Sequence, residues 1–195
     1  MKLSPHFTLG ELTKTKHVTA DGNIPSRVAI ENLIRVCGWL EELRARYNRL
    51  YVWNVEGGMW NENSHVALCA GVRPQSKVAG DCTLAPDPGA APELGAAAAS
   101  RKEEPIVINS GYRSPEVNEL AGGATNSNHL TGCAVDIRCA GKEQMIRYAA
   151  ILLDIADGTK LEFDEMLLEQ HGSVCWLHFA VRPKDNRRRI SFLKA

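Results

Sequence analysis

The sequence has no long hydrophobic run and no excess of charge of either sign. No stretch approaches the ~18 apolar residues of a membrane-spanning helix, so we expect no membrane span. The 195-residue chain carries 23 basic and 23 acidic side chains, and its longest basic run is the three arginines at 187–189. Such a short run is typical of a solvated turn. The composition therefore argues against nucleic acid as a partner.

Closely spaced cysteine pairs and the helical zinc-peptidase motif are also missing. The six cysteines are widely spaced, and none belongs to a Cys-x-x-Cys pair. This agrees with a reducing compartment, although an even count permits disulfides. His-Glu-x-x-His, the motif of thermolysin-type peptidases, does not occur. The first residues lack the apolar segment of an export signal, so we expect the protein to be cytoplasmic as synthesised.

The hydrophobic residues that are present predict a single domain, residues 1–195, with its own core, because they make up 44% of the chain. Thr8 and Glu11 have the spacing of a capping box before a short helix. Apolar residues at helical spacing predict amphipathic helices at 26–47 and 142–156. The first of these helices should bury a stripe that includes Ile34 and leave Trp39 partly exposed.

Strand composition and alternation predict a mostly antiparallel sheet. Together with the helices, this gives the α+β class, with helices on one face of the sheet. The predicted strands lie near residues 105–110, 134–139, 163–169, 174–182 and 190–193.

Residues 49–104 do not fit this pattern. Their stretch 84–100 is rich in alanine, proline and glycine and cannot build a core, so we expect it to be mobile. We interpret 49–104 as an insertion that could lie over the cleft as a lid or a substrate-selecting loop. His65 and Cys69 within it lack partner ligands, and a second zinc site is therefore the weaker interpretation.

Residues 127–136 read SNHLTGCAVD and contain two candidate metal ligands, His129 and Asp136. Seven residues apart, they would point to opposite faces of a strand, and in a helix they would lie about 10 Å apart along the axis. Neither regular element lets both side chains reach one ion. A loop that turns into a strand does, and Gly132 can adopt the backbone angles that such a turn needs.

A third candidate ligand, His178, lies in a segment of strand composition. Alternation places His178 on the same face as Trp176 and Ala180, and opposite Leu177. A lone strand histidine more often packs or hydrogen-bonds than binds a metal. His178 is therefore a candidate ligand only in combination with His129 and Asp136. Two imidazoles and one carboxylate are a ligand set that zinc uses when a fourth position stays open for water.

The order Ser-x-His-x-x-Gly-x-Ala-x-Asp with a later Trp-x-His resembles the zinc D-Ala-D-Ala carboxypeptidase family. Its clan also holds the hedgehog signalling domain and phage endolysins. The resemblance extends to SGYRS at residues 110–114 and covers residues 1–48 and 105–182. It implies that Zn²⁺ is held by His129, Asp136 and His178 on the sheet face opposite the helices.

The resemblance also implies roles in substrate binding. Arg113 corresponds to the arginine that helps hold the substrate's carboxylate or carbonyl, although most arginines form surface ion pairs. A planar, permanently charged guanidinium suits a carboxylate well. Ser127 matches a serine that could hydrogen-bond the substrate or a ligand, and otherwise is a turn or capping residue. Trp176, on the face of His178, is a further candidate for substrate binding.

The general base is where the chain departs from the simplest family pattern. Several members of the clan place an acidic residue three positions before the last histidine, and here that position is Cys175. A cysteine is a poor replacement for a carboxylate that shuttles protons. Glu169 would lie near His178 if the strands at 163–169 and 174–181 pair. We therefore predict Glu169 as the catalytic base, with His171 and Cys175 as alternatives.

These observations predict a zinc metallopeptidase that hydrolyses peptidoglycan stem peptides. A D-Ala-D-Ala carboxypeptidase is the first choice, and an L-Ala-D-Glu or other endopeptidase, as in phage endolysins, is the alternative. A noncatalytic zinc-containing binding or structural module is the third possibility, because Cys175 stands at the position of the base. A wall-cutting enzyme without an export signal suggests a phage or prophage origin, with action on the cell wall after release. We expect a monomer.

Overall fold

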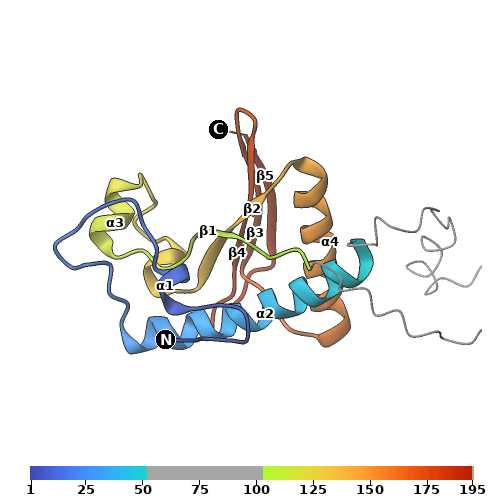
Figure 1. Cartoon of the computed structure of the whole chain (residues 1–195), viewed down its shortest axis with the longest axis horizontal. Coiled ribbons are helices and arrows are strands. Elements are labelled where there is room, and N and C mark those ends of the chain that lie inside the picture. The colour runs from blue at the N-terminus through green and yellow to red at the C-terminus, as the bar shows by residue number, and fades with distance from the viewer. Residues whose placement is uncertain (52–102, 195) are drawn as a thin grey trace, which may run out of the picture. The chain divides into compact units, whose positions relative to one another are not determined.

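A computed structural model describes residues 1–51 and 103–194 (Figure 1). The helices and strands there combine as the α+β class that the sequence predicts. They are α1 (Leu9–Leu12), α2 (Arg27–Tyr51), β1 (Ile108–Ser110), α3 (Pro115–Leu120), the 3₁₀-helix η3 (Asn128–Thr131), β2 (Ala134–Cys139), α4 (Lys142–Thr159), β3 (Glu165–His171), β4 (Val174–Ala180) and β5 (Arg189–Lys194). None of these helices is long and apolar enough to cross a membrane.

The sheet has five strands in the order β1-β2-β4-β3-β5. The pairs β1/β2, β2/β4 and β4/β3 are antiparallel, and only β5 joins in parallel, beside β3. Strands β3 and β4 form a hairpin whose turn contains Gly172 with φ +58°. The predicted, mostly antiparallel sheet is therefore confirmed, and its register aligns Asp136 of β2 with His178 of β4.

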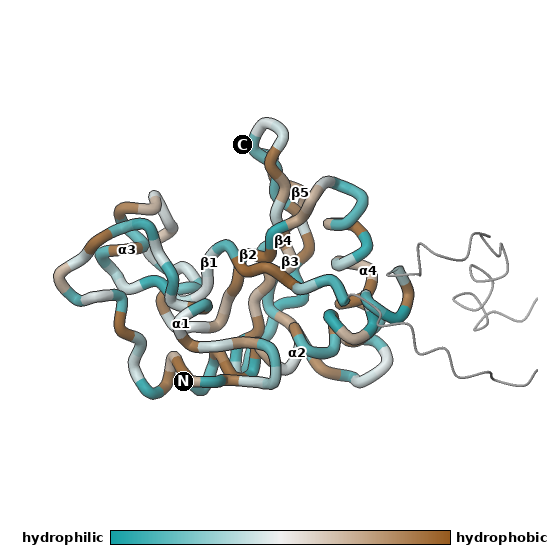
Figure 2. The backbone as a smooth tube through the Cα atoms, in the orientation of Figure 1, coloured by the Kyte–Doolittle hydropathy of each residue, from teal (hydrophilic) through white to brown (hydrophobic). Residues whose placement is uncertain are grey.

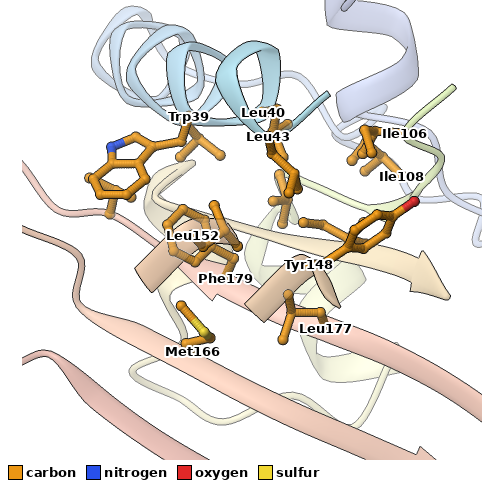
Figure 3. Packing of buried hydrophobic residues seen from close by; sticks show 14 of the residues in the cluster. Trp39, Leu40, Leu43, Ile106, Ile108, Tyr148, Leu152, Met166, Leu177 and Phe179 are labelled. Carbon is orange, nitrogen blue, oxygen red and sulfur yellow. The ribbon is translucent and has the colours of Figure 1, made fainter. Parts of the chain in front are cut away.

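Helices α2 and α4 pack on one face of the sheet and enclose the core (Figures 1 and 3). Figure 2 shows hydrophilic and hydrophobic residues alternating along both helices, as expected for elements with one buried side. The strands contribute alternate residues to this core, and the remaining residues point to the opposite face. Labelled in Figure 3 are Leu40 and Leu43 of α2, Tyr148 and Leu152 of α4, Met166 of β3, and Leu177 and Phe179 of β4.

The buried stripe of α2 differs from the predicted one. Trp39 is only 5% exposed, with its ring centroid 5.3 Å from that of Phe179, whereas Ile34 is 45% exposed. The expectations for both residues are wrong. Trp39 lies three residues after buried Val36 and four before buried Leu43, which places it on the side of the helix that the sheet covers.

The predicted helix boundaries are too short. Helix α2 continues to Tyr51 and α4 to Thr159. At the other end of the predicted insertion, the Glu104 amide donates a hydrogen bond to Asn48 of α2 at 2.6 Å. The outermost residues of the range 49–104 therefore pack with the domain. The predicted mobile stretch 84–100, with His65 and Cys69, lies outside the described residues.

Candidate metal centre

Three side chains from separate elements bring one ligand atom each to a common point. His129 comes from η3, Asp136 from β2 and His178 from β4, and all three are buried. His129 Nε2 lies 3.2 Å from both Asp136 Oδ1 and His178 Nδ1. His178 Nδ1 lies 2.9 Å from the same Asp136 oxygen. The three atoms thus form a small triangle, as the ligands of one ion do.

The size of this triangle suits a zinc ion. Bonds of 2.0–2.1 Å from zinc to nitrogen or oxygen, arranged as a tetrahedron, place neighbouring ligand atoms about 3.3 Å apart. The three separations, 2.9 to 3.2 Å, are close to that value. Two imidazole nitrogens and a carboxylate oxygen are borderline and hard donors of the kind that zinc accepts. The donor set therefore fits Zn²⁺ and occupies three corners of a tetrahedron.

The strands and a tight turn explain how the three residues meet. Asp136 and His178 are directly paired across β2 and β4, so their side chains lie on the same face, away from the helices. The turn between η3 and β2 uses Gly132 with φ +71°. A Cβ at this position would lie 2.4 Å from the carbonyl oxygen of Ala29 in α2, so any side chain would clash. This close approach holds His129 against the end of β2.

Hydrogen bonding orients the first imidazole. His129 Nδ1 lies 2.6 Å from the carbonyl oxygen of Gly111, which can only accept a hydrogen bond. The proton of the neutral ring is therefore on Nδ1, and the lone pair of Nε2 points at Asp136 and His178. Such a backbone partner is typical of histidines that bind metals.

A carboxylate faces the other imidazole from behind. His178 Nε2 lies 3.9 Å from Glu165 Oε2 on the neighbouring strand β3. Glu165 is itself held by Arg187, at 3.0 Å, and by Asn128, at 3.2 Å. The sequence analysis missed Glu165, although its alternation with Leu167 and Glu169 in the predicted strand 163–169 could have placed it on the metal side.

The buried Asp136 carboxylate is held in its charged form. Burial by itself would raise the pKa of Asp136, but the adjacent His129 and His178 rings lower it well below its usual range. Asp136 is only 8% exposed. A negatively charged oxygen beside two imidazole nitrogens is the electrostatic arrangement that a divalent cation needs.

Arg113 pairs with one of the candidate metal ligands. Its guanidinium pairs with Asp136 Oδ2, and its Nε donates a hydrogen bond to Ser110 Oγ at 2.7 Å. The carboxylate oxygen that faces Arg113 is not the one that faces the two histidines. Arg113 therefore orients the Asp136 carboxylate, and its contact with the substrate stays a prediction.

The two other predicted substrate-binding residues are the N-cap residue of η3 and a residue of β4. Ser127 caps η3, where its Oγ accepts a hydrogen bond from the His129 amide at 3.3 Å. This is the capping role that the sequence left open. Trp176 is half-buried on the same face as His178, two residues before it in β4. Its indole can border a substrate that reaches the metal centre.

The three candidates for the catalytic base differ in their position in the sheet and in their exposure. Glu169 of β3 pairs with Trp176 of β4, one side-chain step from His178 on the open face. Burial raises the pKa of Glu169 above its usual range. Cys175 is 3% exposed and faces the helical core opposite Cys139. His171 is exposed at the far end of β3. Of these three candidates, Glu169 is the one that lies on the open face beside the strand position of His178.

Asp164 connects η3, which carries the ligand His129, to the start of β3. Asp164, just before β3, is fully buried and accepts hydrogen bonds from Arg187 Nε at 2.8 Å and Asn128 Nδ2 at 2.8 Å. Asn128 directly precedes the ligand His129. The ion pair of Asp164 with Arg187 therefore helps to fix the position of η3. No sequence pattern predicts this pair, because its two residues are 23 positions apart.

Comparison with known proteins agrees with this geometry. No curated protein matches the chain. Residues 75–165 match the family model described as Peptidase M15, and this segment contains His129 and Asp136, whereas His178 and Glu169 follow it. This match identifies a domain of the Peptidase M15 family, within the clan of D-Ala-D-Ala carboxypeptidases and hedgehog-like proteins, at residues 75–165.

Proposed function

We propose that the protein is a zinc-dependent peptidase that hydrolyses peptidoglycan stem peptides, with the D-Ala-D-Ala carboxypeptidase reaction as the first choice. The observation that supports this most strongly is the convergence of His129, Asp136 and His178, of which the first two lie in the segment that matches Peptidase M15. These residues would hold Zn²⁺. When bound, the ion supplies an activated water with a pKa of about 7 and polarises the scissile carbonyl.

Glu169 is the proposed proton carrier. Its carboxylate lies on the open face, within the fields of His178, Asp136 and Arg113. Burial raises its pKa above the usual glutamate range, and a carboxyl group with a raised pKa is a stronger base towards water. In the proposed reaction, Glu169 takes a proton from the attacking water and delivers it to the departing nitrogen.

The remaining side chains position the reactants. Arg113 holds the second oxygen of Asp136, which keeps the first oxygen directed at the two histidines. Trp176 borders the same face and provides a flat apolar wall for a peptide. The noncatalytic alternative depended on Cys175 standing at the position of the base. The orientation of Cys175 towards the core, with Glu169 on the metal side, supports the catalytic proposal over this alternative.

Product analysis tests the proposal. Zinc-loaded protein is incubated with purified peptidoglycan and with a soluble stem pentapeptide, and the products are identified by mass. Release of D-alanine supports the carboxypeptidase, and internal fragments support an endopeptidase. Zinc-free protein and the Glu169→Gln variant serve as negative controls, and Glu162→Gln, in an exposed position before β3, is the matched control. No product in spite of stoichiometric zinc would overturn the proposal.

A further inference from the structure

Two cysteines face each other across the strand pair that carries two of the candidate metal ligands. Cys139 is the last residue of β2, and the register of the sheet aligns it with Cys175, the second residue of β4. Both thiols are free, and the two residues are only 6% and 3% exposed. Both also belong to the hydrophobic core. The two sulfurs are therefore neighbours in a region that excludes water.

The cysteine side chains lie on the face of the sheet opposite the metal ligands. Cys139 follows Asp136 by three positions, and Cys175 precedes His178 by three positions. Because side chains alternate along a strand, an odd spacing places two residues on opposite faces. The cysteines are thus on the side that the helices cover. A bond between the two sulfurs would join β2 to β4 and leave the ligands unmodified.

The backbone geometry of this pair suits a disulfide. At the other end of the same pairing, the Val181 amide donates a hydrogen bond to the carbonyl oxygen of Cys133 at 2.8 Å. Hydrogen-bonded pairs recur at every second position of an antiparallel ladder, so Cys139 and Cys175 also form such a pair. The Cα atoms of these pairs are about 5.5 Å apart. Disulfides most often join residues with Cα atoms about 5.5–6 Å apart, so no large backbone movement is needed.

Solvent reaches the end of the sheet where the pair lies. Ala140, which directly follows Cys139, is exposed and lines a cavity of about 310 Å³ together with Gly141. Val174, which directly precedes Cys175, is 58% exposed. Strand ends open locally at a lower free energy than the centre of a sheet. A small reagent therefore needs only a local opening to reach the sulfurs.

We infer that Cys139 and Cys175 form a disulfide when the protein meets a small-molecule disulfide oxidant such as oxidised glutathione, and that this bond stabilises the pairing of β2 with β4. One cysteine thiolate attacks the oxidant and forms a mixed disulfide, with release of one thiol. The second cysteine then attacks the mixed disulfide and releases the other thiol. The protein loses two electrons and two protons, and the oxidant takes them up as it becomes two thiols.

The bond would restrain the strands that carry Asp136 and His178, because it closes the loop of residues 139–175. A cross-link of this kind stabilises a protein mainly by restricting its unfolded chain. Burial raises the pKa of the Cys139 thiol to about 12, and Cys175 beside it contributes in the same direction. The Cys139 thiolate is therefore scarce at neutral pH, so exchange in the folded protein should be slow.

Peptide mapping tests the inference. Reduced, metal-free, full-length protein is incubated with a mixture of oxidised and reduced glutathione. Because the buried thiols react slowly, a second sample is unfolded, reduced and refolded in the same mixture. Free thiols are blocked with N-ethylmaleimide before digestion with trypsin. We expect peptide 139–142 to be joined to peptide 161–184, with a mass about 2 Da below the sum of the two thiol peptides, because each sulfur loses one hydrogen.

Thermal unfolding measures the stabilisation. The Tm of the oxidised wild-type protein should lie about 5–10 °C above that of the reduced protein, as expected for a cross-link that closes a loop of this length. In Cys139→Ala and Cys175→Ala, the Tm should be the same in oxidising and reducing buffer. Cys37→Ala removes a buried cysteine of α2 and is the matched control. This variant should keep the full difference in Tm.

Alkylation of both Cys139 and Cys175 in the two samples would overturn the inference and show that these cysteines serve only as small core residues. A bond between them without a rise in Tm would also overturn it, as would loss of the rise in Cys37→Ala. These measurements use neither peptide cleavage nor bound zinc. Their outcome is therefore independent of the proposed function.

Discussion

His178 and Asp136 face each other across β4 and β2, with His178 Nδ1 2.9 Å from Asp136 Oδ1. Strand pairing therefore determines the separation of two of the three candidate ligands. The third ligand, His129, reaches them from a turn that begins outside the sheet. The metal centre depends on both the register of the sheet and the packing of this turn against α2.

Removing the charge of Asp136 should abolish tight metal binding. Asp136→Asn keeps the size of the side chain but replaces the anionic oxygen between the two histidines. We expect zinc affinity to fall by about a hundredfold or more, because an amide oxygen is a much weaker zinc ligand than a carboxylate. Competition with a chromophoric chelator measures this change. Asp185→Asn, in an exposed loop, should leave the affinity unaltered; unchanged affinity in Asp136→Asn would contradict the site.

Glu169→Gln should abolish peptide hydrolysis and leave zinc bound. The amide cannot accept the proton from water, and the residue does not belong to the ligand triangle. We expect kcat to fall by about a thousandfold, within the range of general-base catalysis. Mass analysis of the products and the metal content together measure the result. Substantial activity in this variant would show that another residue is the base.

The pH profile of the wild-type enzyme should report the raised pKa of Glu169. A base acts only when deprotonated, so activity falls as pH drops through its pKa. Burial raises this pKa, and the acidic limb of kcat/KM should therefore lie above the ordinary glutamate value of about 4.3. The profile is measured between pH 4 and 8, with zinc occupancy checked at each point. An acidic limb at or below that value would contradict the assignment of Glu169 as the base.

The sequence predicts the elements of the centre better than its supporting contacts. His129 and Asp136 stand close together in a recognisable motif, and alternation in 174–181 places His178 on the correct face. Arg113 is different: the pattern identifies the residue, but its partner Asp136 lies 23 positions away and depends on how β1 pairs with β2. The burial of Trp39 could not be predicted for a similar reason. Helical spacing alone does not show how much of the surface of α2 the sheet covers.

Glu165→Gln should weaken metal binding without unfolding the protein. The Glu165 carboxylate faces the distal nitrogen of His178 at 3.9 Å and is held by Arg187. At this separation the carboxylate acts on His178 through its charge and not through a hydrogen bond, so we expect zinc affinity to fall by about threefold, less than the loss typical of a hydrogen-bonded partner. Chelator competition measures the effect, and the far-UV circular dichroism spectrum confirms the fold. Glu162→Gln is the matched control, with no expected change. An equal affinity in wild type and Glu165→Gln would show that this carboxylate does not support His178.

Gly132→Ala should destabilise the fold and the metal centre together. The residue has φ +71°, which costs an alanine about 1 kcal/mol, and the new Cβ would lie 2.4 Å from the Ala29 carbonyl oxygen. Relief of that clash requires α2 and the turn before β2 to separate, so we expect a total loss of about 3 kcal/mol. Gly122→Ala isolates the backbone cost, since Gly122 has φ +68° and no atom within 4 Å of the added Cβ. In urea unfolding of the metal-free proteins, the free energy of unfolding should fall by about 1 kcal/mol in Gly122→Ala and by about 3 kcal/mol in Gly132→Ala. Similar losses in the two variants would mean that the approach of α2 does not hold the turn of His129 in place.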